Sequence, residues 1–271
     1  MNVSVLFSLY NKESPDYLYQ MLTSIKQQTL QPDEVVCVID GPIGSDLRAV
    51  LEGWSSFEMK VLELDSNFGL GYALSYGLQF CSGELICRID TDDVMLPNRI
   101  FIQKQFLSQN DDVDICGSIA QDIDEEGRLL SLRQVPEMHD SIKKIIWSCP
   151  VIHPSTMFRK NKILDVGNYS RKVARRQEDY ELWIRCVNSG LIFYNIQEPL
   201  IKYRSYLNSK SKNTIFVAVN RFKIGFDAVN KFDRRLSSYL GLFFPIVRAL
   251  LPHSFYRILF FFCRRFDPRL K

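Results

Sequence analysis

The chain has 271 residues, of which 46% are hydrophobic and 24% charged, and its formal net charge is only +3. These values predict a globular protein, either one large α/β domain or a domain of about 200 residues with an appendage. The seven cysteines stand at scattered positions without a CxxC pair, which excludes a disulfide framework and a zinc knuckle as sources of stability.

Short apolar, β-branched runs alternate with amphipathic stretches, which is typical of a mixed, mostly parallel sheet with flanking helices. The first run, from Val3 to Leu9, lacks the basic region and cleavage site of a secretory signal, so we expect a cytoplasmic protein. Further strands are predicted near residues 34–39, 59–64, 84–89 and 113–119, and helices near 15–28, 45–53, 70–80, 97–108, 140–147, 178–188 and 213–230. A hairpin is predicted after residue 120. Residues 133–177 show no clear period, which predicts a functional insert or lid.

Polar and aromatic side chains follow the first two strands where each ends. Ser8, Tyr10 and Asn11 close the first strand ahead of a helix that begins near Pro15, and Asp40 closes the second strand. The ring of Tyr10 suits stacking on a nucleobase, and Asp40 can accept from a uracil N–H or a ribose hydroxyl. A capping loop and an ordinary Asp-Gly-Pro turn explain the same residues without any ligand.

A glycine-containing loop follows the third strand. Asn67 and Gly69 lie in the segment Asn67-Phe68-Gly69-Leu70-Gly71, which opens the next helix. Its glycines permit close approach of the backbone to a phosphate or a base. It is not a GxGxxG dinucleotide fingerprint, because it has two glycines and follows the third strand rather than the first.

Three carboxylates, Asp90, Asp92 and Asp93, cluster where an apolar strand containing Leu85 and Ile89 ends. The carboxyl ends of strands are the edge at which open α/β sheets bind ligands. Mg²⁺ and Mn²⁺ prefer oxygen ligands and share their shell with substrate phosphates, so a nucleoside diphosphate is the first ligand to consider. The alternative is a solvated turn in which Asp93 caps a helix.

A second acid pair, Glu178 and Asp179, starts an amphipathic helix whose apolar face includes Trp183. The pair either compensates the helix dipole or contains a catalytic base that faces the cleft. Arg176, just before the pair, contacts phosphate or offsets these acids. His153 lies in a rigid loop between prolines and is either structural or close to the metal or the acceptor. We take His153, Trp183 and Arg176 as the acceptor-side candidates.

The C-terminal part of the chain is both basic and apolar. Residues 221–271 hold 11 Lys/Arg against 3 Asp/Glu, together with many aromatic and aliphatic side chains. This composition favours contact with anionic lipids at a membrane surface. The longest uncharged run, Leu236 to Val247, is shorter than the about 20 residues needed to span a bilayer. The alternative is a helix pair packed on the domain or on the second subunit of a homodimer. No nucleic acid is expected, because the apolar residues form one contiguous block.

The order of these segments resembles the family 2 inverting glycosyltransferases of the GT-A fold, especially bacterial members that build O-antigen and exopolysaccharide repeat units on a lipid carrier. The segments are Ser8/Tyr10/Asn11, Asp40-Gly41, Asn67-Phe68-Gly69, Asp90-Thr91-Asp92-Asp93 and Glu178-Asp179. The resemblance covers roughly residues 1–206. It implies a GT-A domain, which we place over residues 1–210, while the composition predicts a helical, membrane-associating tail over 211–271. It also implies that Tyr10 and Asp40 contact the uracil of a UDP-sugar, with Asn67 and Gly69 beside it.

The resemblance assigns the remaining acids as well. Asp90 and Asp92 match the DxD motif, which implies Asp92 as the direct Mn²⁺ or Mg²⁺ ligand and Asp90 nearer the ribose or a metal-bound water. Asp179 matches the catalytic base, and Glu178 is the fallback. One departure concerns Tyr206, which stands where many relatives have a histidine near the metal or diphosphate. Either the Tyr206 side chain contacts the diphosphate, or the metal has fewer protein ligands.

The implied activity is transfer of galactose or glucose from a UDP-sugar to an undecaprenyl-diphosphate-linked sugar such as GlcNAc, at the inner face of the cell membrane. Two alternatives stay open. A sugar-phosphate nucleotidyltransferase would ordinarily show a glycine-rich, basic loop after the first strand, and this chain has none there. A non-catalytic nucleotide-sugar-binding or scaffold subunit of a membrane assembly complex would not need the intact acids at positions 90, 92 and 179.

Overall fold

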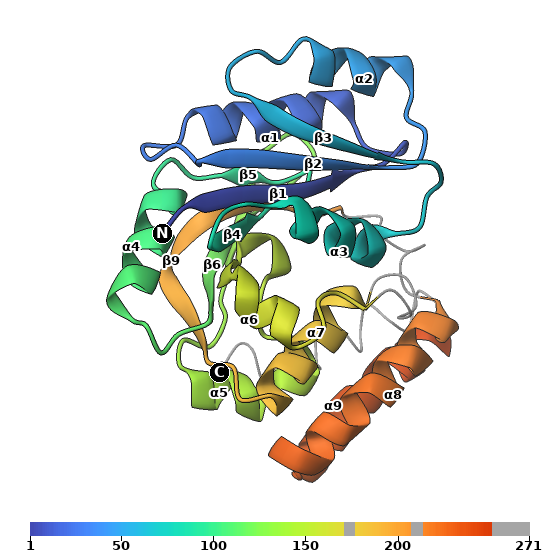
Figure 1. Cartoon of the computed structure of the whole chain (residues 1–271). Coiled ribbons are helices and arrows are strands. Elements are labelled where there is room, and N and C mark those ends of the chain that lie inside the picture. Colours follow the sequence, from blue (N-terminus) through green and yellow to red (C-terminus); the bar gives the residue numbers. More distant parts are fainter. Residues whose placement is uncertain (171–176, 207–213, 251–271) are drawn as a thin grey trace.

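The computed structural model describes residues 1–170, 177–206 and 214–250, and it places helices on both faces of one large sheet (Figure 1). The nine strands follow the order β3-β2-β1-β4-β8-β6-β9-β5, with β7 paired to β6 beside this path. Their bounds are β1 Val3–Leu9, β2 Glu34–Asp40, β3 Met59–Leu64, β4 Leu85–Arg88, β5 Val94–Met95, β6 Ile115–Ile123, β7 Leu129–Arg133, β8 Met157–Arg159 and β9 Phe193–Arg204. The predicted mixed, mostly parallel sheet is confirmed.

The first four strands define the edge at which a ligand would bind. β1 pairs in parallel with β2 on one side and with β4 on the other, and β3 continues the parallel arrangement. The register aligns Leu9 with Ile39, and Val3 with Leu85. The carboxyl ends of β1 and β2 therefore lie side by side, and the chain leaves β4 toward the same edge. β8, β7 and β5 pair antiparallel with their neighbours, whereas β6 and β9 are parallel.

Two hydrophobic clusters, one on each face of the sheet, hold the helices. Alternate residues of the strands face opposite sides, so Leu6 and Val36 join one cluster while Val5 and Cys37 join the other. Helices α1, α2 and α4 cover the second face, and α3, α5, α6 and α7 cover the first. In Figure 1, α1 and α2 lie above the strands and α3 below them. The bounds are α1 Pro15–Lys26, α2 Ser45–Glu52, α3 Leu70–Phe80, α4 Arg99–Gln109, α5 His139–Lys144, α6 Lys160–Asp165 and α7 Glu178–Asn188.

The stretch predicted as an insert or lid, residues 133–177, is part of the core as far as it is described. Its strand β8 lies in the middle of the sheet between β4 and β6, and Met157 and Phe158 are fully buried. Two short 3₁₀ helices, η1 (Ile146–Ser148) and η2 (His153–Ser155), precede it. The prediction of a lid is wrong for this part, because a three-residue strand leaves no periodic signal. Residues 171–176 lie outside the described part of the chain.

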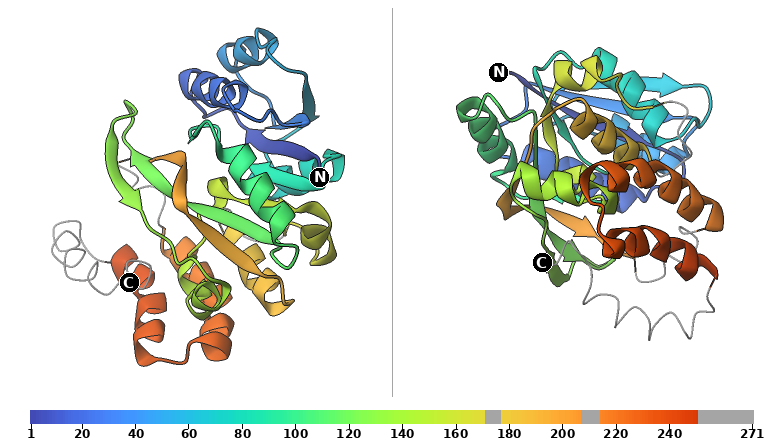
Figure 2. Two further views of the ribbon diagram at one scale, coloured as in Figure 1. Left: turned by 90° about the vertical axis from the view of Figure 1, so that its left-hand side faces the viewer. Right: turned by 90° about the horizontal axis from the view of Figure 1, so that it is seen from below.

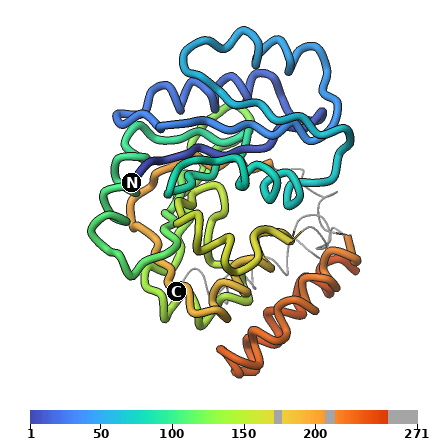
Figure 3. Tube along the Cα trace, in the orientation of Figure 1, coloured from blue at the N-terminus to red at the C-terminus, as the bar shows by residue number. Residues whose placement is uncertain are grey.

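Two C-terminal helices, α8 (Ile215–Phe232) and α9 (Leu236–Leu250), form a hairpin at the edge of the molecule (Figure 2). Ala228, Val229 and Leu242 belong to the same hydrophobic cluster as Trp147 and Tyr180 of the main domain. The trace in Figure 3 shows this hairpin beside α7. Within the described ranges, every helix is too short or too polar to cross a bilayer. Residues 207–213 and 251–271 of the predicted tail lie outside these ranges.

Candidate active site

The sequence predicts that the ends of the first two strands carry a nucleotide site, and the structure brings these ends together. Tyr10 follows β1, with 37% of its surface exposed, and Ser8 is half-buried in the strand. The Asn11 side chain is already used within the protein, because its Oδ1 accepts from the backbone N–H of Gly44 at 2.8 Å. Asn11 therefore fixes the loop that leads into α2. Contact of Ser8, Tyr10 and Asn11 with a nucleotide stays a prediction.

Asp40, at the end of β2, organises the loop before α3. Its two carboxylate oxygens accept from the backbone N–H groups of Phe68 at 2.7 Å and Gly69 at 2.9 Å. The Asn67 side chain donates in turn to the Asp40 carbonyl at 3.2 Å. Gly69 has a φ of +94°, a backbone conformation that side chains disfavour. The structure thus places Asp40, Asn67 and Gly69 together, as expected, and it gives the Asp40 side chain a structural role that the sequence did not indicate.

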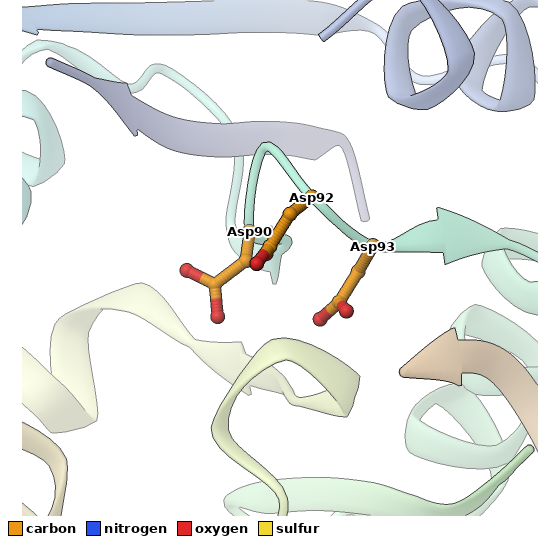
Figure 4. Close-up of side chains that lie close together, drawn as sticks. All are labelled: Asp90, Asp92 and Asp93. Carbon is orange, nitrogen blue, oxygen red and sulfur yellow. The ribbon is translucent and has the colours of Figure 1, made fainter. Parts of the chain in front are cut away.

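The carboxylates of Asp90, Asp92 and Asp93 converge in the turn between β4 and β5 and point to one side of it (Figure 4). Each offers an oxygen within 4.8 Å of the others. Burial, with Asp92 and Asp90 next to it, raises the pKa of Asp93 well above its usual range. Asp93 is no helix cap, because the residue that precedes α4 is Asn98. Its Oδ2 atom is buried without a hydrogen-bond partner in the described structure. An all-oxygen set with an unpaired buried acceptor fits a hard divalent cation.

The end of β9 holds this turn in place. The Arg204 backbone N–H donates to Asp93 at 2.8 Å, and the Arg204 guanidinium donates to the Asp92 carbonyl at 2.9 Å. The hydroxyl of Tyr206 donates to Asp92 Oδ2 at 2.9 Å. The Tyr206 side chain therefore reaches the acid cluster.

Arg88, a buried cation, lies beneath the acid cluster. It was not among the residues predicted from the sequence. Its side chain is 1% exposed and pairs with Asp90 at 2.5 Å, while its Nε and Nη1 atoms have no hydrogen-bond partner in the described structure. Its positive charge acts on the pKa values of Asp93, Glu178 and Asp179. The available signal was a basic residue inside an apolar strand, two positions before Asp90 and therefore on the same face.

Glu178 and Asp179 begin α7, and the charge of Arg88, which pairs with Asp90, acts on both carboxylates. Glu178 is 8% exposed and packs against Gly71 at the start of α3. Burial, with Asp179 as neighbour, raises the pKa of Glu178 to about 7, and the more distant Asp90 contributes in the same direction. Burial also raises the pKa of Asp179, although the Tyr180 N–H, bonded at 2.7 Å, and nearby cations oppose this shift. A carboxylate with a raised pKa at a site of converging charge has the properties of a general base.

Two of the three acceptor-side candidates are core residues. Trp183 is fully buried and packs edge-to-face against His153 and Phe193. His153 is 6% exposed and its Nε2 hydrogen-bonds the hydroxyl of Tyr169 at 2.8 Å. Burial, and then the charge of Arg88, lowers the His153 pKa well below its usual value, so its ring is neutral. The acceptor-side predictions for His153 and Trp183 are therefore wrong. Arg176, the third candidate, lies outside the described residues.

Two more residues near Asp179 come from segments that the sequence analysis assigned elsewhere. The Cys149 thiol lies 3.8 Å from Asp179 Oδ2, just after η1. Arg221, on α8, is one of the cations that lower the pKa of Asp179. No local sequence signal links either residue to position 179, because they meet it only through packing.

Comparison with known proteins places this site in a family. The model of the family "Glycosyl transferase family 2" matches residues 4–179, and the chain belongs to this family and is a glycosyltransferase. It is 37% identical over 204 residues to the amylovoran biosynthesis glycosyltransferase AmsE of Erwinia amylovora, covering 74% of this chain and 76% of AmsE. It is 34% identical over 223 residues to the UDP-Gal:alpha-D-GlcNAc-diphosphoundecaprenol beta-1,3-galactosyltransferase of Escherichia coli, covering 81% and 80%.

The fold has relatives among solved structures. The S. aureus TarS fragment 1–349 in complex with UDP-GlcNAc aligns with a TM-score of 0.65 at 17% identity, over 99% of this chain and 88% of that one. A likeness at this identity supports the fold alone. Together, the family match and this alignment confirm the glycosyltransferase fold that the sequence predicts. The names of the two curated relatives refer to amylovoran biosynthesis and to transfer of galactose from UDP-Gal to GlcNAc-diphosphoundecaprenol.

Proposed function

We propose that this protein is a metal-dependent inverting glycosyltransferase of O-antigen or exopolysaccharide synthesis. It transfers a hexose, galactose or glucose, from a UDP-sugar to a lipid-diphosphate-linked sugar such as GlcNAc-diphospho-undecaprenol. The name of the Escherichia coli galactosyltransferase supports the donor and acceptor classes. The observation that carries the chemistry is that one buried cation, Arg88, pairs with Asp90 of the acid cluster and also acts on the charges of both acids at the start of α7.

The donor side is built from the strand ends. Tyr10 offers its exposed ring to the uracil, beside the Asp40 carboxylate and the loop with Asn67 and Gly69. Asp90, one-third exposed, would lie nearer the ribose or a metal-bound water. Because Asp40 fixes the N–H groups of that loop, the donor pocket is held in shape before the nucleotide arrives.

Asp92 and Asp90 would hold Mn²⁺ or Mg²⁺, and the position of Asp93 makes it a third candidate ligand. Such an ion neutralises the charge that grows on the departing diphosphate. Tyr206, in contact with Asp92, orients that carboxylate. Arg204 keeps the turn from moving, because it bonds the Asp92 carbonyl and the Asp93 side chain at once.

Asp179 takes the proton from the acceptor hydroxyl as the oxygen attacks the anomeric carbon from the face opposite UDP. The new carbon–oxygen bond forms while the bond to the diphosphate breaks, and its electron pair leaves with UDP. A single displacement inverts the anomeric centre. Glu178, whose pKa burial raises to about 7, is the fallback base.

The test is turnover with defined substrates. UDP-sugars are screened by UDP release with a short-chain lipid-diphosphate GlcNAc acceptor, and the anomeric configuration of the product is read by NMR. Wild type is expected to turn over one of the UDP-hexoses with inversion, whereas Asp92→Asn and Asp179→Asn lose about 10²- to 10⁴-fold in kcat. Binding of UDP without turnover of any UDP-hexose would contradict the proposal and favour a nucleotide-sugar-binding scaffold. A retained anomeric configuration would contradict inversion.

We also propose that the C-terminal hairpin lies on the membrane surface. Phe216, Leu236, Leu240 and Phe243 expose between 47% and 74% of their surface, and the basic residues of this region complement anionic lipids. Triple replacement of Phe216, Leu240 and Phe243 by Ser is expected to reduce flotation with anionic vesicles. Removal of α9 is a poorer test, because Leu242 is buried against the domain. Unchanged flotation of the folded triple variant would contradict membrane contact through this face.

A further inference from the structure

Arg221 connects the C-terminal hairpin to the helix that carries the proposed base. Its guanidinium lies over the ring of Tyr180, 4.5 Å from the ring centre, and its Nη2 donates to the carbonyl of Ser148 at 3.0 Å. Tyr180 follows Asp179 directly, and its backbone N–H is the one that Asp179 accepts. Arg221 therefore contacts both segments that flank the Asp179 carboxylate, α7 and η1.

The close approach of α8 depends on a residue without a side chain. A Cβ atom at Gly225 would lie 2.1 Å from the Tyr180 hydroxyl, which is itself held by the Trp147 carbonyl at 2.7 Å. Leu242 of α9 packs on the same position. The main domain thus provides a close-packed contact surface for α8, and Tyr180, the residue next to the proposed base, forms part of it.

Charged and titratable groups face Asp179 from every element packed around it. Arg88 comes from β4, Glu178 from α7 itself, Cys149 from the segment after η1, Tyr169 from the segment after α6 and Arg221 from α8. Arg88 and Arg221 supply positive charge, and Arg88 is already paired with Asp90. Arg221 is accordingly the cation whose loss would be felt most directly by Asp179 rather than by the acid cluster.

We infer that Arg221 is a positioning residue for the base, so that the α8–α9 hairpin completes the active site. The inference rests on the proposed role of Asp179. The guanidinium fixes Tyr180 and η1 around the Asp179 carboxylate and keeps that carboxylate ionised and aimed at the acceptor. The catalytic unit then extends beyond residue 210, to the end of α9. A hairpin bound to the membrane surface would position the base where a lipid-linked acceptor is found.

The experiment uses the full chain, the UDP-hexose found active with wild type, and a short-chain lipid-diphosphate GlcNAc acceptor that needs no membrane. Arg221→Met keeps an apolar stem over Tyr180 without the charge, and Arg221→Lys keeps the charge without the planar group. The matched control is Lys223→Met, a charge loss on the exposed side of the same helix. Measured are kcat, KM for the donor, the pH profile of kcat and the Kd for UDP.

Arg221→Met is expected to lower kcat about tenfold. The acidic limb of its pH profile should move to higher pH, because the carboxylate loses a stabilising cation. The donor KM and the Kd for UDP should stay within about twofold of wild type, because Arg221 does not touch the donor side. Arg221→Lys should restore the position of the acidic limb, and Lys223→Met should match wild type.

The outcomes separate the two claims. Wild-type kcat and pH profile in folded Arg221→Met, beside an inactive Asp179→Asn, overturn the inference alone. Full activity of Asp179→Asn overturns the role of the base and the inference with it. Where Arg221→Met fails to fold, Arg221→Gln replaces it, because its amide can still donate to the Ser148 carbonyl. An unshifted acidic limb in Arg221→Gln equally overturns the inference.

Discussion

At the scale of single residues, the site contains a buried charge, the Arg88 guanidinium, whose donors are only partly paired within the described structure. Arg88 is almost fully buried, and among the described residues it forms one ion pair, to Asp90, although a guanidinium offers five donors. A buried cation of this kind is costly to leave alone but useful beneath a cluster of acids, because it lowers their mutual repulsion. The structure therefore ties stability to the acids that the proposed chemistry needs.

Arg88→Met is expected to lower the free energy of unfolding by about 3 kcal/mol, near the lower end for breaking a buried pair, because Asp90 is one-third exposed and can be rehydrated. The control is Arg48→Met, which removes a paired arginine that is 39% exposed opposite a Glu63 that is 55% exposed. Such a solvent-exposed pair contributes little to stability. Urea unfolding at pH 7 measures both. Equal losses for the two variants would contradict the role assigned to Arg88.

The acid pair at the start of α7 predicts a characteristic pH dependence. Activity should fall as the pH drops, with an acidic limb above the range of an ordinary aspartate, because burial raises the pKa of Asp179 and only its ionised form accepts a proton. Glu178→Gln removes a negative neighbour, so its acidic limb should move to lower pH while most of kcat is kept. The pH profiles of kcat for wild type, Glu178→Gln and Asp179→Asn measure this. A limb that moves to higher pH in Glu178→Gln, or full activity of Asp179→Asn, would reverse the assignment of the base.

At the scale of elements, the ends of β2 and α3 are joined by the Asp40 carboxylate rather than by the chain itself. Asp40→Ala should free the N–H groups of Phe68 and Gly69 and loosen the loop beside the proposed nucleobase site. We expect the donor KM to rise about tenfold, with a smaller change in kcat, since the base and the acid cluster are untouched. Asp65→Asn, an exposed acid just before the same loop, is the control. An unchanged donor KM in Asp40→Ala would show that the loop does not shape the donor pocket.

Most elements with a local signal could be predicted from the sequence. The strands that begin with Val3 and Glu34 and the helices on either side of them follow from apolar periodicity, and the structure places them within a few residues. β8 could not be found in this way, because three residues carry no period and its place is fixed by pairing of Phe158 with Ile86 and Ile115. Because β8 left no periodic signal, residues 133–177 were predicted to be an insert or lid rather than part of the sheet.

In the candidate site too, residues with a local sequence signal could be predicted, whereas residues placed by tertiary packing could not. The strand-end acids were predictable because parallel strands end at one edge of the sheet. His153 and Trp183 were misassigned because a short motif does not reveal which face of a segment is buried. Arg88 and Arg221 were missed because their roles come from burial and from packing between distant segments, which sequence spacing does not encode.

At the scale of the whole molecule, the hairpin and the main domain are held together by a buried carboxylate. Asp233, between α8 and α9, accepts from Trp147 at 3.0 Å, from Ser238 at 2.6 Å and from Arg235 at 2.6 Å. Burial alone would raise its pKa, but the hydrogen bonds from Arg235, Ser238 and Trp147 overcome it and lower the pKa to about 2. A carboxylate with a depressed pKa stabilises the fold above its unfolded pKa, and this contribution is lost as the pH falls through about 2.

Asp233→Asn should therefore cost about 2 kcal/mol of unfolding free energy at pH 7, and its difference from wild type should shrink as the medium becomes strongly acidic. Asp227→Asn, an exposed acid on α8, is the control.

Because the same hairpin carries Arg221, Asp233→Asn should also lower kcat when the hairpin loosens, even though residue 233 is remote from any substrate. Urea unfolding at pH 7 and pH 3 and kcat at pH 7 measure both effects. A destabilised variant with wild-type kcat would mean that the hairpin is held by Asp233 but is not needed by the base.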